Sequence, residues 1–157
     1  MTYSVRPAGE RDLDALARFE ADIARISFAE DAVVDEEVHR RKLERAMTKD
    51  PRGMFVAEAP DGTTVGWLWI SLNTNFLTGD PYANFRSLAI DDAHHGTGVA
   101  ELLLEAGIAF ACDADVNEIT GRVHVGNGGM RALYRKFGFE AVHLVMRKRC
   151  EPAEEVG

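Results

Sequence analysis

The most constraining feature of this sequence is a strand-like segment, 82–90, that passes through a short turn into a long amphipathic helix. The turn contains Gly96 and Gly98, and the helix carries apolar residues at helical spacing to about Asp113. Another strand-like segment, Ile119–Val125, comes next. A strand, a helix and a second strand in this order predict a parallel strand pair, because a crossover helix connects parallel neighbours.

The flanking segments predict a mixed sheet with helices on both faces. Pro60-Asp61-Gly62-Thr63 is a turn sequence between two strand-like runs, which predicts an antiparallel hairpin. Asp35 is a predicted helix N-cap, and Gly138 fits the left-handed position after a helix. The expected strands are Tyr3–Arg6, Met54–Ala59, Thr64–Leu72, Tyr82–Ile90, Ile119–Val125 and Glu140–Lys148, and the expected helices are 9–28, 35–49, 99–113 and 128–137.

Length and composition predict one α/β domain over residues 1–150, with a frayed tail at 151–157. The formal net charge of −8 disfavours a nucleic-acid binder, because phosphate binding needs clustered positive charge. The N-terminal residues lack the apolar run of a signal peptide, and no stretch has the length of a membrane span. Cys112 and Cys150 are too few for a disulfide framework, although a single disulfide stays possible, and the five histidines lack ligand spacing. We therefore expect a cytoplasmic protein with neither a metal nor a membrane partner.

Two motifs carry candidate chemistry. The turn with Gly96 and Gly98 would expose backbone N–H groups at the positive end of a helix, which favours an anion, although a plain tight turn explains Gly-x-Gly equally well. The second motif runs from Asn127 through Tyr134 to Gly138. Tyr134 lies on an apolar helical stripe and also fits a core position, and Asn127 also fits a helix cap.

Taken together, the two motifs make the chain similar to the GNAT superfamily of N-acetyltransferases. The family motif Arg/Gln-x-x-Gly-x-Gly/Ala reads here as His95-Gly-Thr-Gly98-Val-Ala100. The family's Asn followed seven residues later by Tyr reads as Asn127 and Tyr134. His95 replaces the usual Arg or Gln, and Ala93 replaces a common Pro. Since such a loop works mainly through backbone N–H groups, these departures should weaken cofactor binding without abolishing it.

The resemblance implies a GNAT fold, with a central mixed sheet of six to seven strands and four helices on both faces. Acetyl-CoA would lie where two parallel strands splay apart, with no metal required. Arg131 and Lys136 are possible contacts of its 3′-phosphate, or else belong to a solvated helix face. The implied cofactor-binding residues are Leu88, Ala89, Ile90, His95, Gly96, Thr97, Gly98, Val99, Ala100, Glu101, Asn127 and Tyr134.

The implied reaction transfers the acetyl group of acetyl-CoA to a primary amine by direct attack in a ternary complex. Tyr134 is the implied general acid for the departing thiolate. Arg122 stands where some relatives have a Glu base, so His124 is the candidate base, with a surface histidine and a water chain as alternatives. The alternative function is a catalytically inactive acyl-CoA-binding sensor or interaction module with the same fold.

The acceptor side is less determined. Acidic rims favour a cationic small-molecule or peptide amine, although a solvated acidic face explains them equally well. The rim residues are Glu30, Asp31, Asp35, Glu36 and Glu37 in one loop and Asn73, Asn75 and Asp80 in another, and the aromatic residues Trp67, Trp69, Phe76 and Tyr82 form either a cleft wall or core. Val142, Leu144 and Met146 on the last expected strand could support a homodimer or face the core.

Overall fold

The computed structural model describes residues 2–28 and 33–150, so Glu30 and Asp31 of the predicted acidic rim lie outside the described residues. The contacts divide the chain into two compact units, Met1–His124 and Val125–Gly157. The first unit consists of β1 (Ser4–Pro7), the 3-10 turn η1 (Glu10–Asp12), α1 (Leu13–Phe28), α2 (Glu36–Lys49), β2 (Met54–Glu58), β3 (Thr64–Thr74), β4 (Pro81–Ile90), the 3-10 turn η3 (Asp92–His94), α3 (Val99–Asp113) and β5 (Glu118–Gly121). The second unit contains α4 (Gly128–Lys136).

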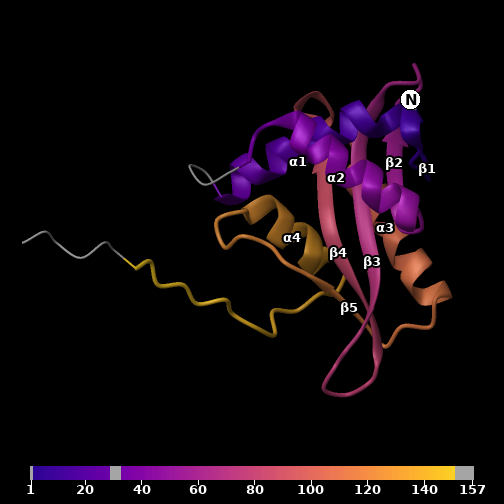
Figure 1. Cartoon of the computed structure of the whole chain (residues 1–157). Coiled ribbons are helices and arrows are strands. Elements are labelled where there is room, and N and C mark those ends of the chain that lie inside the picture. Colours follow the sequence, from indigo (N-terminus) through magenta and orange to yellow (C-terminus); the bar gives the residue numbers. More distant parts are fainter. Residues whose placement is uncertain (1, 29–32, 151–157) are drawn as a thin grey trace, which may run out of the picture. The chain divides into compact units, whose positions relative to one another are not determined.

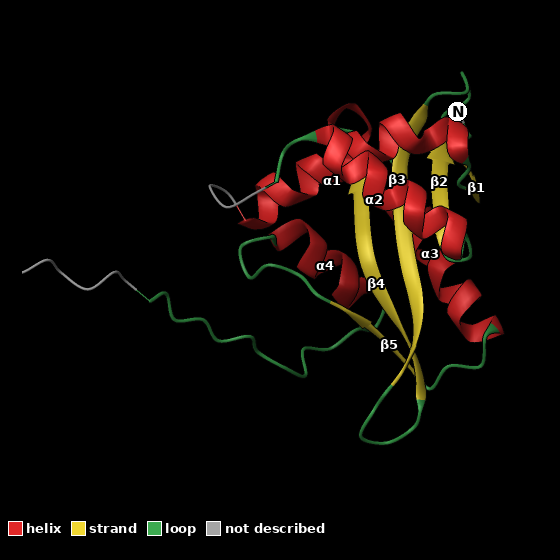
Figure 2. Ribbon diagram, viewed as in Figure 1, coloured by secondary structure: helices red, strands yellow, loops and turns green. Residues whose placement is uncertain are grey.

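The described residues form one five-stranded sheet with the order β1-β2-β3-β4-β5 (Figure 2). Strands β1 to β4 pair antiparallel with their sequence neighbours, and β4 pairs parallel with β5. The predicted hairpin and the predicted parallel pair are therefore confirmed. The ladder between β4 and β5 ends at Phe85 and Gly121, whereas β4 continues to Ile90. The two parallel strands thus stop pairing half-way along β4.

Helices α1 and α2 lie across one face of the sheet (Figure 1). On this face Leu16, Phe19 and Leu43 pack with Trp67 and Trp69 in a buried cluster. Burying side chains of this size stabilises the fold by about 1.5–3 kcal/mol each, which holds the two helices on the sheet. The predicted apolar stripes of both helices are thereby explained.

Helix α3 lies on the opposite face of the sheet. At Gly107 the helix comes so close that an added Cβ would stand 2.6 Å from Leu68 Cδ2 and 2.7 Å from Phe85 Cε1. Leu68 lies between Trp67 and Trp69 on β3, and neighbouring strand residues point to opposite faces. The sheet is therefore covered by helices on both faces, as predicted.

A bulge interrupts β4 at Arg86. The register with β3 shifts between Trp69 and Ile70, which leaves Arg86 as an extra residue on β4. An extra residue breaks the alternation of side chains and changes where they point. As a result, Arg86 and Ser87 both reach the face covered by α1 and α2, although they are consecutive. Arg86 Cζ lies 3.9 Å from the centroid of the Trp69 ring, and Ser87 Oγ donates to Glu20 Oε1 at 2.6 Å.

Asp12 is a buried carboxylate that ties β1 to β3. It accepts hydrogen bonds from the Arg6 guanidinium at 2.9 Å, from Gly9 N–H at 2.8 Å and from Thr64 Oγ1 at 3.3 Å. Burial alone would raise the pKa of Asp12, but these hydrogen bonds, with Arg6 first among them, outweigh it and lower the pKa. The stabilisation is therefore complete above the ordinary pKa of an aspartate and is lost as pH falls through the lowered value.

The second unit confirms a helix and corrects a strand. Helix α4 forms as predicted, and Gly138 has the left-handed φ of 85° expected after it. The strand expected over Glu140–Lys148 is not formed, and all side chains of 140–150 are exposed. Alternating apolar residues suggested it, but a strand also needs a partner for its backbone N–H and C=O groups. The sheet in the described residues therefore has five strands instead of six to seven, and β5 ends at Gly121 instead of Val125.

Among the described residues, no helix combines the length and the apolar character needed to cross a membrane.

Gly53, which precedes β2, supports the region of the bulge. Its φ is +84°, and an added Cβ would lie 2.0 Å from the backbone oxygen of Ile70. We expect Gly53→Ala to lower the free energy of unfolding by about 3 kcal/mol, because backbone strain adds to a clash that a backbone atom cannot avoid. Gly62→Ala is the matched control, since Gly62 has a φ of +86° but its nearest neighbour, Glu58 Oε1, is 3.8 Å away. The control should lose only about 1 kcal/mol in denaturant unfolding. Equal losses would contradict the close approach at Gly53.

Candidate functional site

The edge of β4 beyond the end of β5 is the first part of the candidate site. Asp91 N–H donates to the Val65 carbonyl at 2.8 Å, so the backbone groups of alternate residues such as Ala89 point toward β3. The backbone N–H and C=O of Leu88 and the backbone N–H of Ile90 therefore point away from β3, toward the side where β5 has ended. In the described part of the first unit, no strand pairs with this edge. An extended ligand can bind there as an added strand does.

The glycine turn leads from this edge into α3. Gly96 and Gly98 have φ values of 75° and 88°, and an added Cβ at either would meet nothing within 4 Å. Only glycine adopts this conformation at no steric cost, and the space in front of the turn is open. Leu102 N–H donates to the Gly98 carbonyl at 3.1 Å, which is the first hydrogen bond of α3. The N–H groups of Val99 and Ala100 precede that bond and lie at the positive end of the helix, where an anion is favoured.

Side-chain hydrogen bonds hold the turn in place. His95 Nε2 lies 3.0 Å from the Ile90 carbonyl oxygen, so this nitrogen carries the hydrogen and donates it. Thr97 Oγ1 donates to the His94 carbonyl, and Tyr3 Oη lies 2.8 Å from His94 Nδ1. His95, the residue that departs from the family motif, thus contacts the end of β4. The predicted residues Leu88–Ile90 and His95–Glu101 form one continuous edge and turn.

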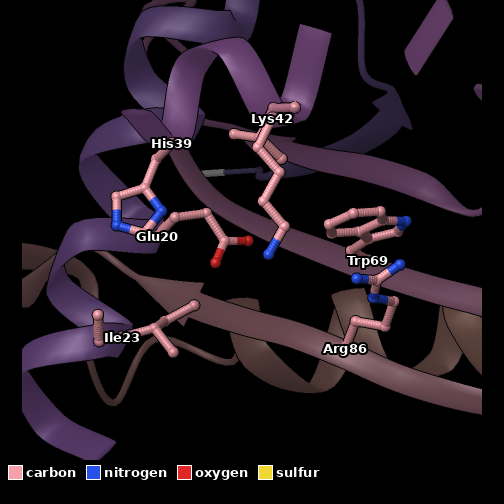
Figure 3. A pocket seen from close by; sticks show the side chains of 8 residues that line it. Glu20, Ile23, His39, Lys42, Trp69 and Arg86 are labelled. Atoms are coloured by element: carbon pink, nitrogen blue, oxygen red, sulfur yellow. The ribbon is translucent and has the colours of Figure 1, made fainter. Parts of the chain in front are cut away.

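A pocket of about 210 Å³ opens on the face of the sheet that α1 and α2 cover. Figure 3 shows Glu20 and Lys42 pointing into it from α1 and α2, with Arg86 stacked on Trp69 at the opposite side. Arg86 follows the last residue of β4 that pairs with β5, so the pocket lies beside the point where the two strands part. The complete lining is Glu20, Ile23, Ala24, His39, Lys42, Leu43, Trp69 and Arg86.

The second unit carries Asn127 and Tyr134. Asn127 Oδ1 accepts a hydrogen bond from Met130 N–H at 3.1 Å, so Asn127 caps α4. Tyr134 is half-buried, its ring centroid lies 5.0 Å from that of Phe139, and burial raises the pKa of its phenol to about 12. The Tyr134 side chain therefore stays protonated at neutral pH. Arg131 Nη1 donates to the Val125 carbonyl at 3.0 Å, which gives this residue a structural contact within α4 and the segment before it.

His124 is exposed and stands after the end of β5. The expectation that it shares a strand face with Arg122 is wrong, because the strand ends at Gly121. The parallel ladder stops there, so no pairing imposes alternation on the residues that follow. A role for His124 as a base stays a prediction.

Most of the residues expected to contact the acceptor do not line this pocket. Asp35 accepts a hydrogen bond from Glu37 N–H at 2.9 Å and caps α2, as predicted, and Glu37 pairs with Arg41 at 3.2 Å. Trp67 is fully buried in the core, whereas Phe76 in the β3–β4 loop is fully exposed. Asn73 lies on β3 and pairs with Tyr82, so it is not in the loop where it was expected, whereas Asn75 and Asp80 do lie between β3 and β4. None of these residues lines the pocket, and neither do Asp35, Glu36 and Glu37.

No pattern in the sequence pointed to Glu20, Lys42 and Arg86 as site residues. Glu20 and Lys42 lie on the faces of two different helices, and Arg86 owes its direction to a bulge. Only Trp69, which was predicted as cleft wall or core, takes both roles, since it is 7% exposed and lines the pocket.

No group of three or more His, Cys, Asp or Glu side chains suited to a metal ion occurs within residues 2–28 and 33–150. Cys112 and Cys150 are both free and exposed.

Comparison with known proteins decides the family. Residues 17–139 match the model of the Acetyltransferase (GNAT) family. The chain belongs to this family. The resemblance that rested on the two motifs is therefore confirmed.

Named relatives are acetyltransferases. The mycothiol acetyltransferase of Saccharomonospora viridis is 30% identical over 105 residues, which cover 65% of this chain and 34% of that protein. The chain spans about a third of the length of the mycothiol acetyltransferases that it matches. The aminoglycoside N(6′)-acetyltransferase type 1 of Stenotrophomonas maltophilia is 27% identical over 117 residues, which cover 71% of this chain and 76% of that protein.

Solved structures share the GNAT fold. A putative acetyl transferase from Pyrococcus furiosus has a TM-score of 0.76 and 19% identity, covering 95% of this chain and all (100%) of the other. The aminoglycoside 6′-N-acetyltransferase AAC(6′)-Ih of Acinetobacter baumannii has a TM-score of 0.73 and 17% identity, covering 97% and 100%. At these identities the likeness concerns the fold alone.

Proposed function

We propose that this GNAT protein transfers the acetyl group of acetyl-CoA to a primary amine by direct attack in a ternary complex. The observation that carries the proposal is the edge of β4 at Leu88–Ile90, which pairs with no strand in the part of the chain that the structure describes and runs directly into the turn with Gly96 and Gly98. The amides of a pantetheine arm can pair with such an edge, and a pyrophosphate can approach glycines whose missing Cβ leaves open space.

The residues fit acetyl-CoA as a co-substrate at this place. Leu88, Ala89 and Ile90 would hold the pantetheine arm, and the backbone from Gly96 to Glu101 would hold the pyrophosphate. The His95 imidazole would reach the ligand only by giving up its hydrogen bond to Ile90. Asn127 and Tyr134 are assigned to the cofactor by the family motif that they match.

The proposed step balances as an acyl transfer. The nitrogen lone pair of the neutral amine attacks the thioester carbonyl, and the new C–N bond forms. The nitrogen of the tetrahedral intermediate then loses a proton to water, the C–S bond breaks to release the CoA thiolate, and the thiolate takes up a proton from water, which leaves the amide and the free CoA thiol. The amine first loses the proton that keeps it an ammonium, which costs roughly 4 kcal/mol at pH 7.4 for a pKa of about 10.4. A water chain or His124 would accept this proton. The Leu88 N–H, which points away from β3, would stabilise the oxyanion of the tetrahedral intermediate.

Tyr134 would serve as the donor to the departing sulfur. A phenol pKa of about 12 guarantees a proton at neutral pH, but full transfer to a thiolate with an ordinary pKa of about 8.5 is uphill by roughly 5 kcal/mol. A hydrogen bond that strengthens as charge develops on the sulfur avoids that cost. We therefore assign Tyr134 the role of a hydrogen-bond donor in the transition state, with complete protonation of the thiolate left to water.

The extent of the domain, its cellular location and its oligomeric state are proposals that rest on the sequence. We propose a single domain over 1–150 that acts in the cytoplasm and that can form a homodimer. Val142, Leu144 and Met146 are exposed in the described structure, which leaves them accessible for such a contact.

The activity is tested by thiol release from acetyl-CoA with a panel of primary amines, together with the melting temperature of the protein with acetyl-CoA. We expect acetyl-CoA to raise the melting temperature and at least one amine to accelerate thiol release. Stabilisation without turnover on any amine would favour a sensor or interaction module, and no stabilisation at all would contradict both functions.

Gly98→Glu tests the turn. We expect this variant to lose measurable acetyl-CoA binding, because its carboxylate would stand at the helix N-terminus where the pyrophosphate belongs. Gly79→Glu is the matched control, since Gly79 has a φ of +77°, has open space in front of it and lies in the β3–β4 loop. Calorimetry should give the control a wild-type dissociation constant. A normal dissociation constant for Gly98→Glu would show that the turn is assigned wrongly.

Tyr134→Phe tests the proposed donor. We expect kcat to fall by about 10²-fold while acetyl-CoA affinity stays nearly the same, which is the usual size of a donor effect. The phenyl ring retains the packing against Phe139, so the melting temperature should hardly change. Unchanged turnover would assign Tyr134 to packing alone.

A further inference from the structure

The pocket between α1, α2 and the sheet has an unusual charge distribution for a chain with a net charge of −8. Its lining contains two basic side chains, Lys42 and Arg86, together with His39 and one carboxylate, Glu20. Within the described residues, neither cation has an ion-pair partner, whereas Arg40 and Arg41 on the same helix as Lys42 both do. The charges facing the pocket are therefore available to a ligand.

Glu20 is fixed by two hydrogen bonds at one oxygen. Trp67 Nε1 donates to Glu20 Oε1 at 3.2 Å, and Ser87 Oγ donates to the same atom at 2.6 Å. Oε2 has no such partner among the described residues, and the carboxylate points into the pocket (Figure 3). A held carboxylate with one oxygen available is suited to binding an ammonium.

Arg86 and Lys42 offer the opposite charge. The Arg86 guanidinium is stacked on Trp69, with its Cζ 3.9 Å from the ring centroid, which restricts the directions in which its N–H groups point. A guanidinium held in this way can bind an oxyanion with two parallel hydrogen bonds. Lys42 points into the same pocket from α2 (Figure 3). Ile23, Ala24 and Leu43 supply the apolar part of the lining.

From these contacts we infer that the pocket binds an acceptor that carries an oxyanion, a carboxylate or a phosphate monoester, close to its amine. Glu20 holds the ammonium, and Arg86 together with Lys42 holds the oxyanion. This inference rests on the proposed acetyl transfer and names its acceptor class. It replaces the purely cationic acceptor that the acidic loops suggested, because a polycation would meet two like charges here.

The position of the pocket fits such an acceptor. Arg86 and Ser87 lie where β4 stops pairing with β5, directly before the edge Leu88–Ile90 that is proposed to hold the thioester. An amine beside Glu20 is therefore near the β4 backbone where the acetyl group would lie. The volume of about 210 Å³ corresponds to about seven water molecules, so the enclosed part of the acceptor is small.

Matched acceptor pairs test this inference. β-Alanine is compared with β-alaninamide, and 2-aminoethyl phosphate with ethanolamine, while spermidine represents a purely cationic amine. We expect the anionic member of at least one pair to have a kcat/KM at least tenfold above that of its neutral partner and above that of spermidine. The pair that shows the preference distinguishes a carboxylate from a phosphate. Equal or better kcat/KM values for both neutral members or for spermidine would overturn the inference while leaving acetyl transfer intact.

Variants locate the preference in the pocket. We expect Arg86→Gln and Lys42→Gln each to reduce the ratio within the preferred pair at least fivefold, through a higher KM of the anionic member at nearly constant kcat. Glu20→Gln should instead lower kcat/KM of both members of a pair, because both contain the amine. Arg45→Gln is the control, since Arg45 is exposed on α2 and does not line the pocket. A preference that survives both Arg86→Gln and Lys42→Gln would overturn the inference.

Thermal shift with the same compounds, measured without acetyl-CoA, makes the outcome independent of turnover. We expect the preferred anionic compound to raise the melting temperature of the wild type and of Arg45→Gln but not of Arg86→Gln. If acetyl-CoA does not stabilise the protein, the proposed function fails. The melting-temperature shift with the anionic compound still tests whether the pocket binds it. No shift with either anionic compound, together with no turnover of either, would overturn the inference.

Discussion

The bulge at Arg86 is the constraint on which the arrangement of the candidate site depends. One extra residue on β4 directs both Arg86 and Ser87 to the face covered by α1 and α2, and the ladder with β5 ends immediately before it. A regular strand would alternate these two side chains between the faces of the sheet. The bulge thus places a pocket with a cation on one face of the sheet, and directly after it comes an edge of β4 with which no strand of the described residues pairs.

The packing around the bulge holds its geometry in place. Ile70, which follows the register shift, donates its N–H to the Gly53 carbonyl at 2.8 Å, and no side chain fits between these two backbones. Trp69 stands on the other side of the shift, packed with α1 and α2 and stacked against Arg86. Strand β3 is thus held at both residues that flank the irregularity. An irregularity of this kind is tolerated because the surrounding packing determines its geometry.

Local chemistry explains why much of the fold could be predicted from the sequence. A cap such as Asp35 or a left-handed glycine such as Gly138 depends on residues only a few positions away, so the pattern and the outcome agree. The strand expected over Glu140–Lys148 failed because alternation specifies which face a side chain takes but not which strand supplies a partner. The bulge was not predictable for the same reason, since it exists only in the register between β3 and β4.

The contrast between local patterns and tertiary contacts also applies to the two ligands of the proposed reaction. Acetyl-CoA is assigned to backbone groups, and backbone conformation leaves a trace in the sequence as Gly96 and Gly98, which have positive φ. The acceptor is assigned to side chains on three elements, and no local pattern connects Glu20, Lys42 and Arg86. Net charge does not describe the pocket, because acidic residues such as Asp14 and Glu44 lie outside it and form ion pairs with Arg40. In the proposed reaction, recognition of the acceptor would therefore depend on how the helices pack on the sheet, whereas recognition of the donor would depend on one turn and the strand edge before it.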